Sequence, residues 1–135
     1  MSKARRVGAS LGLAALFSAL APAADVPQAD RDRALAKAEF ALKAYQQARV
    51  FFLERRLGID TAYLWSIRAL DTKLALCQNE DERTSALQAH VEDMQGIERI
   101  MKAAGRVGQT NQLEFSSVAY YRIEAMQWLA HGRPK

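Results

Sequence analysis

Cysteine is almost absent from this chain of 135 residues, which contains only Cys77. An intrachain disulfide needs two cysteines, so we expect the fold to depend on an apolar core. Cys77 is expected to lie in that core as a small apolar residue. The alternative is a reactive thiol, but no histidine lies close to Cys77 in the sequence.

Proline is scarce as well, because beyond residue 24 the chain has only Pro27 and Pro134, one near each end. The interior is rich in Ala, Leu, Arg, Lys, Glu and Gln, which favour helices. No run of alternating apolar, β-branched residues predicts a strand. The sequence therefore predicts an all-α fold of three or four helices, forming an elongated antiparallel coiled-coil hairpin or bundle.

The first residues have the order of a signal peptide. Three basic residues precede an apolar or small run over 7–20, and small residues follow at 21–24. We expect residues 1–23 to be a cleaved export signal, followed by one helical domain over 24–135. A helix tethered in the membrane is the alternative, but about 14 apolar residues fall short of the roughly 20 that span a bilayer.

A strong charge of one sign is missing from the expected mature chain. The full sequence has 19 Lys and Arg residues against 15 Asp and Glu. Removal of Lys3, Arg5 and Arg6 takes three from the 19, so 16 basic residues face 15 acidic ones. Proteins that bind nucleic acid usually present a strongly basic surface. The mature chain is therefore not expected to bind nucleic acid.

Apolar residues spaced three and four apart predict the helices and their buried faces. The first helix is expected over 28–57, closed by Gly58 in a left-handed conformation, with Asp60 or Thr61 capping the next helix. The expected buried stripe of this first helix comprises Leu35, Ala38, Leu42, Tyr45 and Phe52.

Two interpretations remain open for residues 60–104. They form one unbroken helix, or the helix breaks at Asn79, which has Glu82 at the capping-box distance. Gly105 and Gly108 are expected to end this segment, Thr110 or Asn111 to cap the last helix, and His131–Gly132 to close it. The expected buried residues are Tyr63, Ile67, Leu70, Leu74 and Cys77, then Leu87, Val91, Met94, Ile97 and Met101, and finally Ala119, Ile123, Met126 and Ala130.

The stretches 51–65 and 101–115 share one pattern of helix, glycine, polar cap and helix. Gly58 aligns with Gly108, and Asp60 aligns with Thr110. The pattern is consistent with an internal repeat, but any junction between two helices has a similar composition, and identity between the halves is low.

Two longer stretches carry a family resemblance. They read ARVFFLERRLGIDTAYLWSIRALDTKLAL and MKAAGRVGQTNQLEFSSVAYYRIEAMQWLA. Each resembles the periplasmic coiled-coil repeats of the outer-membrane efflux protein (TolC) family. The segments AYLWSIR (62–68) and RTSALQAHVEDM (83–94) are similar to small exported helical proteins of bacteria that are grouped with efflux proteins. The resemblance covers roughly residues 30–131.

The chain departs from that family in one important respect. A channel of this kind requires membrane strands of alternating apolar residues, and the sequence has none. It is also much shorter than a full efflux subunit. The resemblance therefore implies a helical hairpin module without a pore.

Residues suited to chemistry are few, and the only histidines are His90 and His131. Residues 90–94 do not form the two-histidine zinc motif. His90, Met94 and Met101 follow one helical spacing, and imidazole with thioether groups suits copper. The alternative interpretation places both methionines in the core and leaves the histidine half-exposed.

The segment Tyr120–Glu124 is dense in aromatic and polar groups. Its Arg122 is a candidate for contact with a carboxylate or a partner, although such residues also form solvated helix edges. Trp65 and Trp128 are suited to an interface or to a core, and we favour the core.

The sequence assigns no catalytic, cofactor-binding or metal-binding residue and no small-molecule substrate. We expect a non-catalytic, exported structural or interaction module of the cell envelope, related to efflux, that contacts a partner helix or a second copy of itself. One alternative is a periplasmic ligand- or metal-sensing protein. Another is a small secreted all-α enzyme, built on charged residues between helices: Arg68, Lys73, Glu92, Arg99 and Arg122.

Overall fold

A computed structural model describes residues 26–106, 108 and 111–135 of the chain. These residues form four helices and no strand, as the all-α prediction requires: α1 (Gln28–Leu53), α2 (Ile59–Leu76), α3 (Glu80–Gly105) and α4 (Gln112–His131). The expected signal peptide lies outside the described residues. None of the helices in the described part of the chain is long and apolar enough to span a bilayer.

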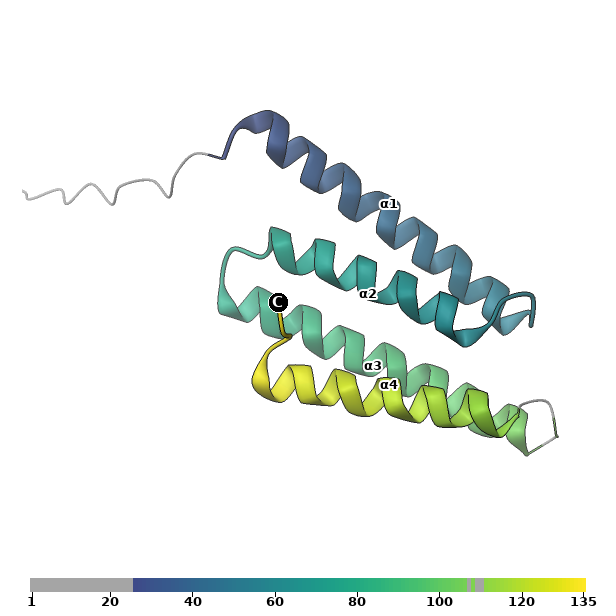
Figure 1. The fold of residues 1–135 in the computed structure, drawn as a ribbon. Helices are drawn as coiled ribbons and strands as arrows, with labels where there is room; N and C mark the ends of the chain where they lie inside the picture. The colour runs from purple at the N-terminus through teal and green to yellow at the C-terminus, as the bar shows by residue number, and fades with distance from the viewer. Residues whose placement is uncertain (1–25, 107, 109–110) are drawn as a thin grey trace, which may run out of the picture.

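Successive helices run antiparallel, so α1 and α3 point the same way, as do α2 and α4 (Figure 1). The helix backbones come close in four pairs, namely α1 with α2, α3 with α4, and α2 with both α3 and α4. Within the described residues, the backbone of α1 therefore approaches α2 alone. The bundle consists of two helical hairpins, α1–α2 and α3–α4, joined through α2, and the main core cluster contains residues of all four helices, including Ala48 and Phe52 of α1.

The core centres on α3, whose predicted stripe is confirmed. Met94 and Ile97 are among the largest fully buried side chains, together with Val118 of α4. The regular spacing of large apolar residues in α3 leaves one face of the helix strongly apolar, and this face packs against α2 and α4. The buried members of the predicted stripe are Leu87, Val91, Met94, Ile97 and Met101.

The predicted stripe of α1 is wrong for its two leucines. Leu35 and Leu42 are exposed, whereas Ala41 and Ala48 are buried against α2. Small side chains allow two helix backbones to approach closely, since the distance between packed helices depends on the residues at their contact. Alanines therefore occupy the line of contact with α2, and the leucines are displaced to its side.

The predicted buried face of α4 is also wrong. Ile123 and Met126 are exposed, while Val118 and Ala125 are buried. The observed stripe lies one residue earlier than the predicted one, which is a rotation of about 100° around a helix of 3.6 residues per turn. The rotation is set by polar contacts, because it brings Tyr121 to α2 and Arg122 to α3.

The first interhelical loop differs from its prediction. α1 ends at Leu53, and Arg55 rather than Gly58 has the left-handed conformation, with φ of 60°. Gly58 has φ of −72° and occupies the N-cap position of α2, so Asp60 falls in the first turn of that helix. Arg55 and Arg56 therefore lie in the loop between the helices, beyond the last turn of α1.

The predicted break at Asn79 is confirmed, and its cap explains it. The Asn79 side chain accepts a hydrogen bond of 2.9 Å from the backbone N–H of Glu82. Asn111 accepts an equivalent bond of 2.8 Å from the N–H of Glu114 at the start of α4. Each cap satisfies an N–H group that the first helical turn leaves free, and so fixes where the helix begins.

Candidate functional site

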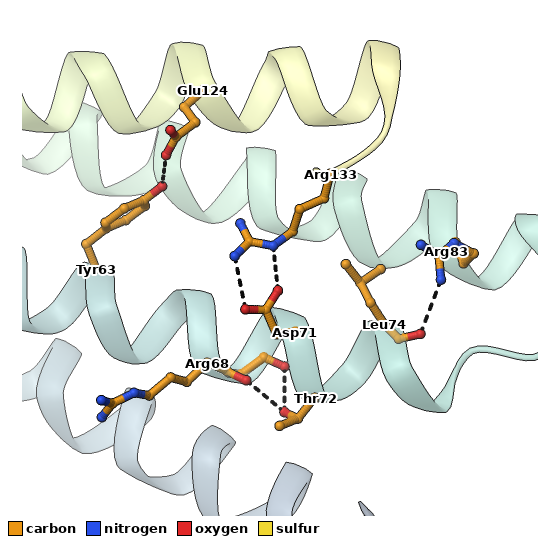
Figure 2. Close-up of polar contacts among 9 residues, drawn as sticks. Tyr63, Arg68, Asp71, Thr72, Leu74, Arg83, Glu124 and Arg133 are labelled. Carbon is orange, nitrogen blue, oxygen red and sulfur yellow. Dashed lines mark hydrogen bonds and ion pairs between the residues drawn. The ribbon is translucent and has the colours of Figure 1, made fainter. Parts of the chain in front are cut away.

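Two tyrosines connect α2 to α4 through reciprocal hydrogen bonds. The Tyr63 phenol donates to Glu124 (Figure 2), and the Tyr121 phenol donates to Asp60 over 2.6 Å. The two rings stack with centroids 3.6 Å apart and planes 7° from parallel. Burial, followed by the neighbouring carboxylate, raises the pKa of each phenol well above its usual value. Both tyrosines therefore remain hydrogen-bond donors across the neutral range.

The C-terminal tail folds back onto α2. Gly132 has a positive φ of 83°, which ends α4 and redirects the chain. Arg133 then donates to both carboxylate oxygens of Asp71, over 2.5 and 3.0 Å, as Figure 2 shows. Its guanidinium also lies 4.2 Å from the centroid of the Trp128 ring. The tail thus covers one side of Trp128, which is half-buried rather than fully in the core.

His90 lies in the interior between α2 and α4, contrary to the half-exposed position considered from the sequence. Its ring centroid is 5.9 Å from that of Trp128 and 6.4 Å from that of Tyr63. Burial lowers the pKa of His90 to about 4, so the imidazole is neutral near pH 7. Within the described residues, Nε2 of His90 has no hydrogen-bond partner.

The structure does not bring His90 and the two methionines together as a ligand set. Met94 and Met101 belong to the apolar core cluster, and the contacts of His90 are aromatic rings. Groups of three or more His, Cys, Asp or Glu residues suited to a metal are also missing from the described part of the chain. Cys77 is half-buried and packs against the second core cluster.

Arg122, a candidate from the sequence for contact with a carboxylate or a partner, forms an ion pair with the buried Glu98. Arg122 lies 2.8 Å from Glu98 of α3, and Lys102 lies 3.5 Å from the other oxygen of the same carboxylate. Glu98 is buried, so the two cations compensate its charge inside the protein. Tyr121, Arg122 and Glu124 are thus all used in contacts between helices.

The residues proposed for an enzyme do not converge. Arg68 lies over the ring of Trp65, and Glu92 accepts a hydrogen bond from Gln88 within α3. Arg122 is paired with Glu98, as described above. These three residues come from three different helices and are engaged separately.

A groove of about 530 Å³ lies between α1 and α3. Two contacts cross its base, because the Tyr45 phenol donates to Asp93 of α3 and Arg49 lies 3.8 Å from the same carboxylate. Burial, and then the Asp93 carboxylate, raises the pKa of Tyr45 and keeps it a donor. The floor is built mainly from small residues of α2 and α3, namely Ser66, Ala69, Ala86 and Ala89.

An exposed apolar row runs along α1, and we call it the α1 stripe; three of its four members, Leu42, Val50 and Leu53, line this groove. Its members are between 43 and 56% exposed and follow one another at intervals of seven, eight and three residues. These intervals keep them on one face of the helix. A second exposed set on α4, with Leu113, Tyr120, Ile123 and Met126, lies away from the groove. The α1 stripe comprises Leu35, Leu42, Val50 and Leu53.

Sequence reasoning missed the groove because it assigned Leu35 and Leu42 to the core. Ala41 and Ala48, which form the true contact face, are seven residues apart, but so are Leu35 and Leu42, so spacing alone does not distinguish the two faces. It also missed the acidic partners of the interhelical contacts. For the tyrosine pair, the available signal is an acidic residue three positions from each ring, at Asp60 and Glu124.

Comparisons with known proteins give no match: no family model, no curated protein and no solved structure matches this chain.

Proposed function

We propose that the chain is a non-catalytic, exported helical interaction module of the cell envelope, which binds a protein helix at the α1 stripe and the groove beside it. One observation carries the proposal: four large apolar side chains are exposed along a single face of α1. Single exposed apolar residues are common on proteins, but a contiguous exposed row typically marks an interaction surface.

The shape of the groove supports a helix as the bound element. Ala86 and Ala89 present small side chains on its α3 side, where another helix can approach closely. Such a helix lies outside the Tyr45 and Arg49 contacts with Asp93. An amphipathic helix placed in an apolar groove is a common mode of recognition, with contacts three, four and seven residues apart. The α1 stripe offers apolar contacts at intervals of this kind.

Two further parts of the proposal rest on the sequence. Export and the cell-envelope location rest on the signal-peptide order of residues 1–23. The relation to efflux rests on the resemblance of residues 30–131 to the periplasmic repeats of efflux proteins. A non-catalytic role is supported by the separate contacts of three charged candidates for catalysis. Arg122 pairs with Glu98 of α3, whereas Arg68 and Glu92 make contacts within their own helices.

Site-specific photo-cross-linking in the native cell tests the binding surface. A photoreactive amino acid at Leu42 is expected to give discrete adducts with a protein, either another protein or a second copy of the chain. Leu64 of α2 is a matched control, because it is 47% exposed against 49% for Leu42 and lies beside the opposite groove. The binding role would be overturned if position 42 gave no more adducts than position 64.

Export is tested separately by fractionation and mass spectrometry. The expected result is a mature chain in the envelope fraction whose first residue is Ala24 or Asp25. A chain that retains residues 1–23 and stays in the cytoplasmic fraction would contradict the envelope location, whatever the cross-linking result.

A further inference from the structure

We infer that the helix bound at the α1 stripe is α1 of a second copy of this chain, in antiparallel orientation. The inference rests on the proposed function, since it names the partner for the same surface. The antiparallel pairing is supported by the set of apolar and charged residues that face each other when two α1 helices lie side by side in opposite directions.

Apolar residues of the two helices face each other when the two-fold axis that relates the copies passes beside residue 44. A residue i of one copy then lies opposite residue 88 minus i of the other. Leu35 falls opposite Leu53 of the partner, and this contact occurs twice. Leu42 falls opposite Gln46, which lies on the same face and also lines the groove. A symmetric pair of this kind is closed, so it forms a dimer and not a filament.

Charge complementarity favours the same register. Glu39 falls opposite Arg49 of the partner, again twice. In the single chain, Glu39 is paired only with Lys43 in an exposed contact, which contributes little. Nε of Arg49 lies 3.8 Å from Asp93, and the Arg49 side chain is 40% exposed. A guanidinium carries five N–H donors, so its terminal nitrogens can donate to a second carboxylate while Nε stays beside Asp93.

Other arrangements bring like charges together. A parallel pair in register places Arg49 against Arg49. An antiparallel pair shifted by four residues brings Leu42 opposite Val50, but it also sets Lys43 against Arg49. Like charges facing each other across an interface oppose association. The register centred beside residue 44 is the one of these three that combines apolar and opposite-charge contacts within α1. It also places Arg33 opposite Arg55 of the partner, but Arg55 lies beyond the end of α1 at Leu53.

In this pairing, the partner helix contacts the groove as well as the α1 stripe. A partner helix beside the α1 stripe lies over the small residues Ala86 and Ala89, and so is held between α1 and α3. By symmetry, each copy covers the groove of the other. The pairing therefore buries the exposed row of α1, which the other helices of the same chain leave uncovered.

Disulfide cross-linking tests the orientation in the full mature chain. Cys77 is first replaced by Ser, and Leu35→Cys and Leu53→Cys variants with tags of different length are then mixed and oxidised. The expected product is mainly the mixed 35–53 disulfide. Dominant 35–35 and 53–53 products would overturn the antiparallel arrangement. Both positions are exposed, so neither substitution disturbs the core.

Light scattering over a range of concentrations tests the dimer itself. We expect wild-type chain to approach twice its monomer mass, and Leu42→Glu to raise the dissociation constant at least about tenfold, which corresponds to roughly 1.4 kcal/mol. The matched Leu64→Glu variant should remain dimeric. Circular dichroism of each variant checks that the helices are retained.

Failure of this inference is distinguishable from failure of the proposed function. A chain that stays monomeric at every concentration, yet gives adducts with a different protein from position 42, overturns the self-pairing and keeps the interaction module. A monomeric chain that gives no adducts from position 42 overturns both.

Discussion

Tyr63 and Tyr121 are related by an exchange of carboxylates: each phenol donates to an acidic residue that lies three positions from the other ring. Asp60 faces Tyr121 and Tyr63 faces Glu124, so both pairs have the same sequence separation of 61 residues. Equal separations at successive turns require α2 and α4 to be parallel. The stacked rings therefore fix both the direction and the register of two helices that are not adjacent in the sequence.

Removal of either phenol should destabilise this register. We expect Tyr121→Phe to lower the free energy of unfolding by about 1 kcal/mol, the usual contribution of a hydrogen bond. Tyr63→Phe should cost more, about 1–3 kcal/mol, because it leaves the less accessible Glu124 without its main donor. Urea unfolding measures both values. Tyr120→Phe is the comparison: its exposed phenol makes only a long hydrogen bond of 3.5 Å to Glu124, so its loss should change stability by less than either.

Acid should destabilise the protein through His90. The pKa of this group is about 4 in the folded chain and near 6.5 when unfolded. Between these values the unfolded state binds more protons, so stability falls as the pH decreases, by up to about 1.4 kcal/mol per pH unit. Below about pH 4 both states are protonated and this contribution levels off.

Urea unfolding from pH 7 to pH 4 tests the role of His90. We expect His90→Gln to show a shallower loss of stability over this range than the wild-type chain. NMR titration of the His90 ring in a His131→Asn variant gives an independent check. A ring that titrates near pH 6.5 in the folded chain would show that burial does not control its protonation.

Replacement of Glu98, whose carboxylate is buried, should destabilise the protein more than replacement of an exposed acidic residue. Glu98→Ala leaves Arg122 without its partner at 2.8 Å, in a site where its charge is partly desolvated. We expect a loss of about 2–3 kcal/mol, at the lower end for a broken buried pair because Arg122 is not fully enclosed. Glu92→Ala on the exposed side of α3 should change stability by less than about 0.5 kcal/mol. Equal effects in thermal unfolding would contradict this account.

Replacement of Gly96 by alanine is expected to stabilise the protein. A Cβ atom at this position would meet only the tip of the Arg99 side chain, at 3.8 Å. Alanine should therefore fit within α3 and raise the free energy of unfolding by up to about 1 kcal/mol, because glycine is a poor helix former. Gly132→Ala is the contrasting case, since its φ of 83° strains any residue with a Cβ. Thermal unfolding should move in opposite directions for the two variants.

The parts of the fold that follow from local chemistry were predictable. Asn79 and Asn111 each satisfy a backbone N–H three residues ahead, so the break between α2 and α3 and the start of α4 could be identified without a structure. The stripe of α3 was also correct, because it has one apolar face and therefore one way to be buried.

The faces of α1 and α4 were not predictable by the same rule. α1 offers both leucines and alanines at helical spacing, and the choice depends on how closely α2 approaches. In α4 the choice depends on Asp60 and Glu98, which are distant in the sequence and determine which way Tyr121 and Arg122 must point. The candidate surface was missed for the same reason, since Leu42 becomes available only once Ala41 occupies the contact.

The arrangement of helix pairs also determines how the chain folds. Among the described residues, three of the four close pairs join helices that follow each other directly, and only α2 with α4 skips one. Such contacts have low sequence separation, so little loop-closure entropy is lost before they form. Helical proteins of this kind fold on the order of microseconds to milliseconds. The α1–α2 and α3–α4 hairpins are expected to be the early folding units, with the tyrosine pair aligning them in the final step.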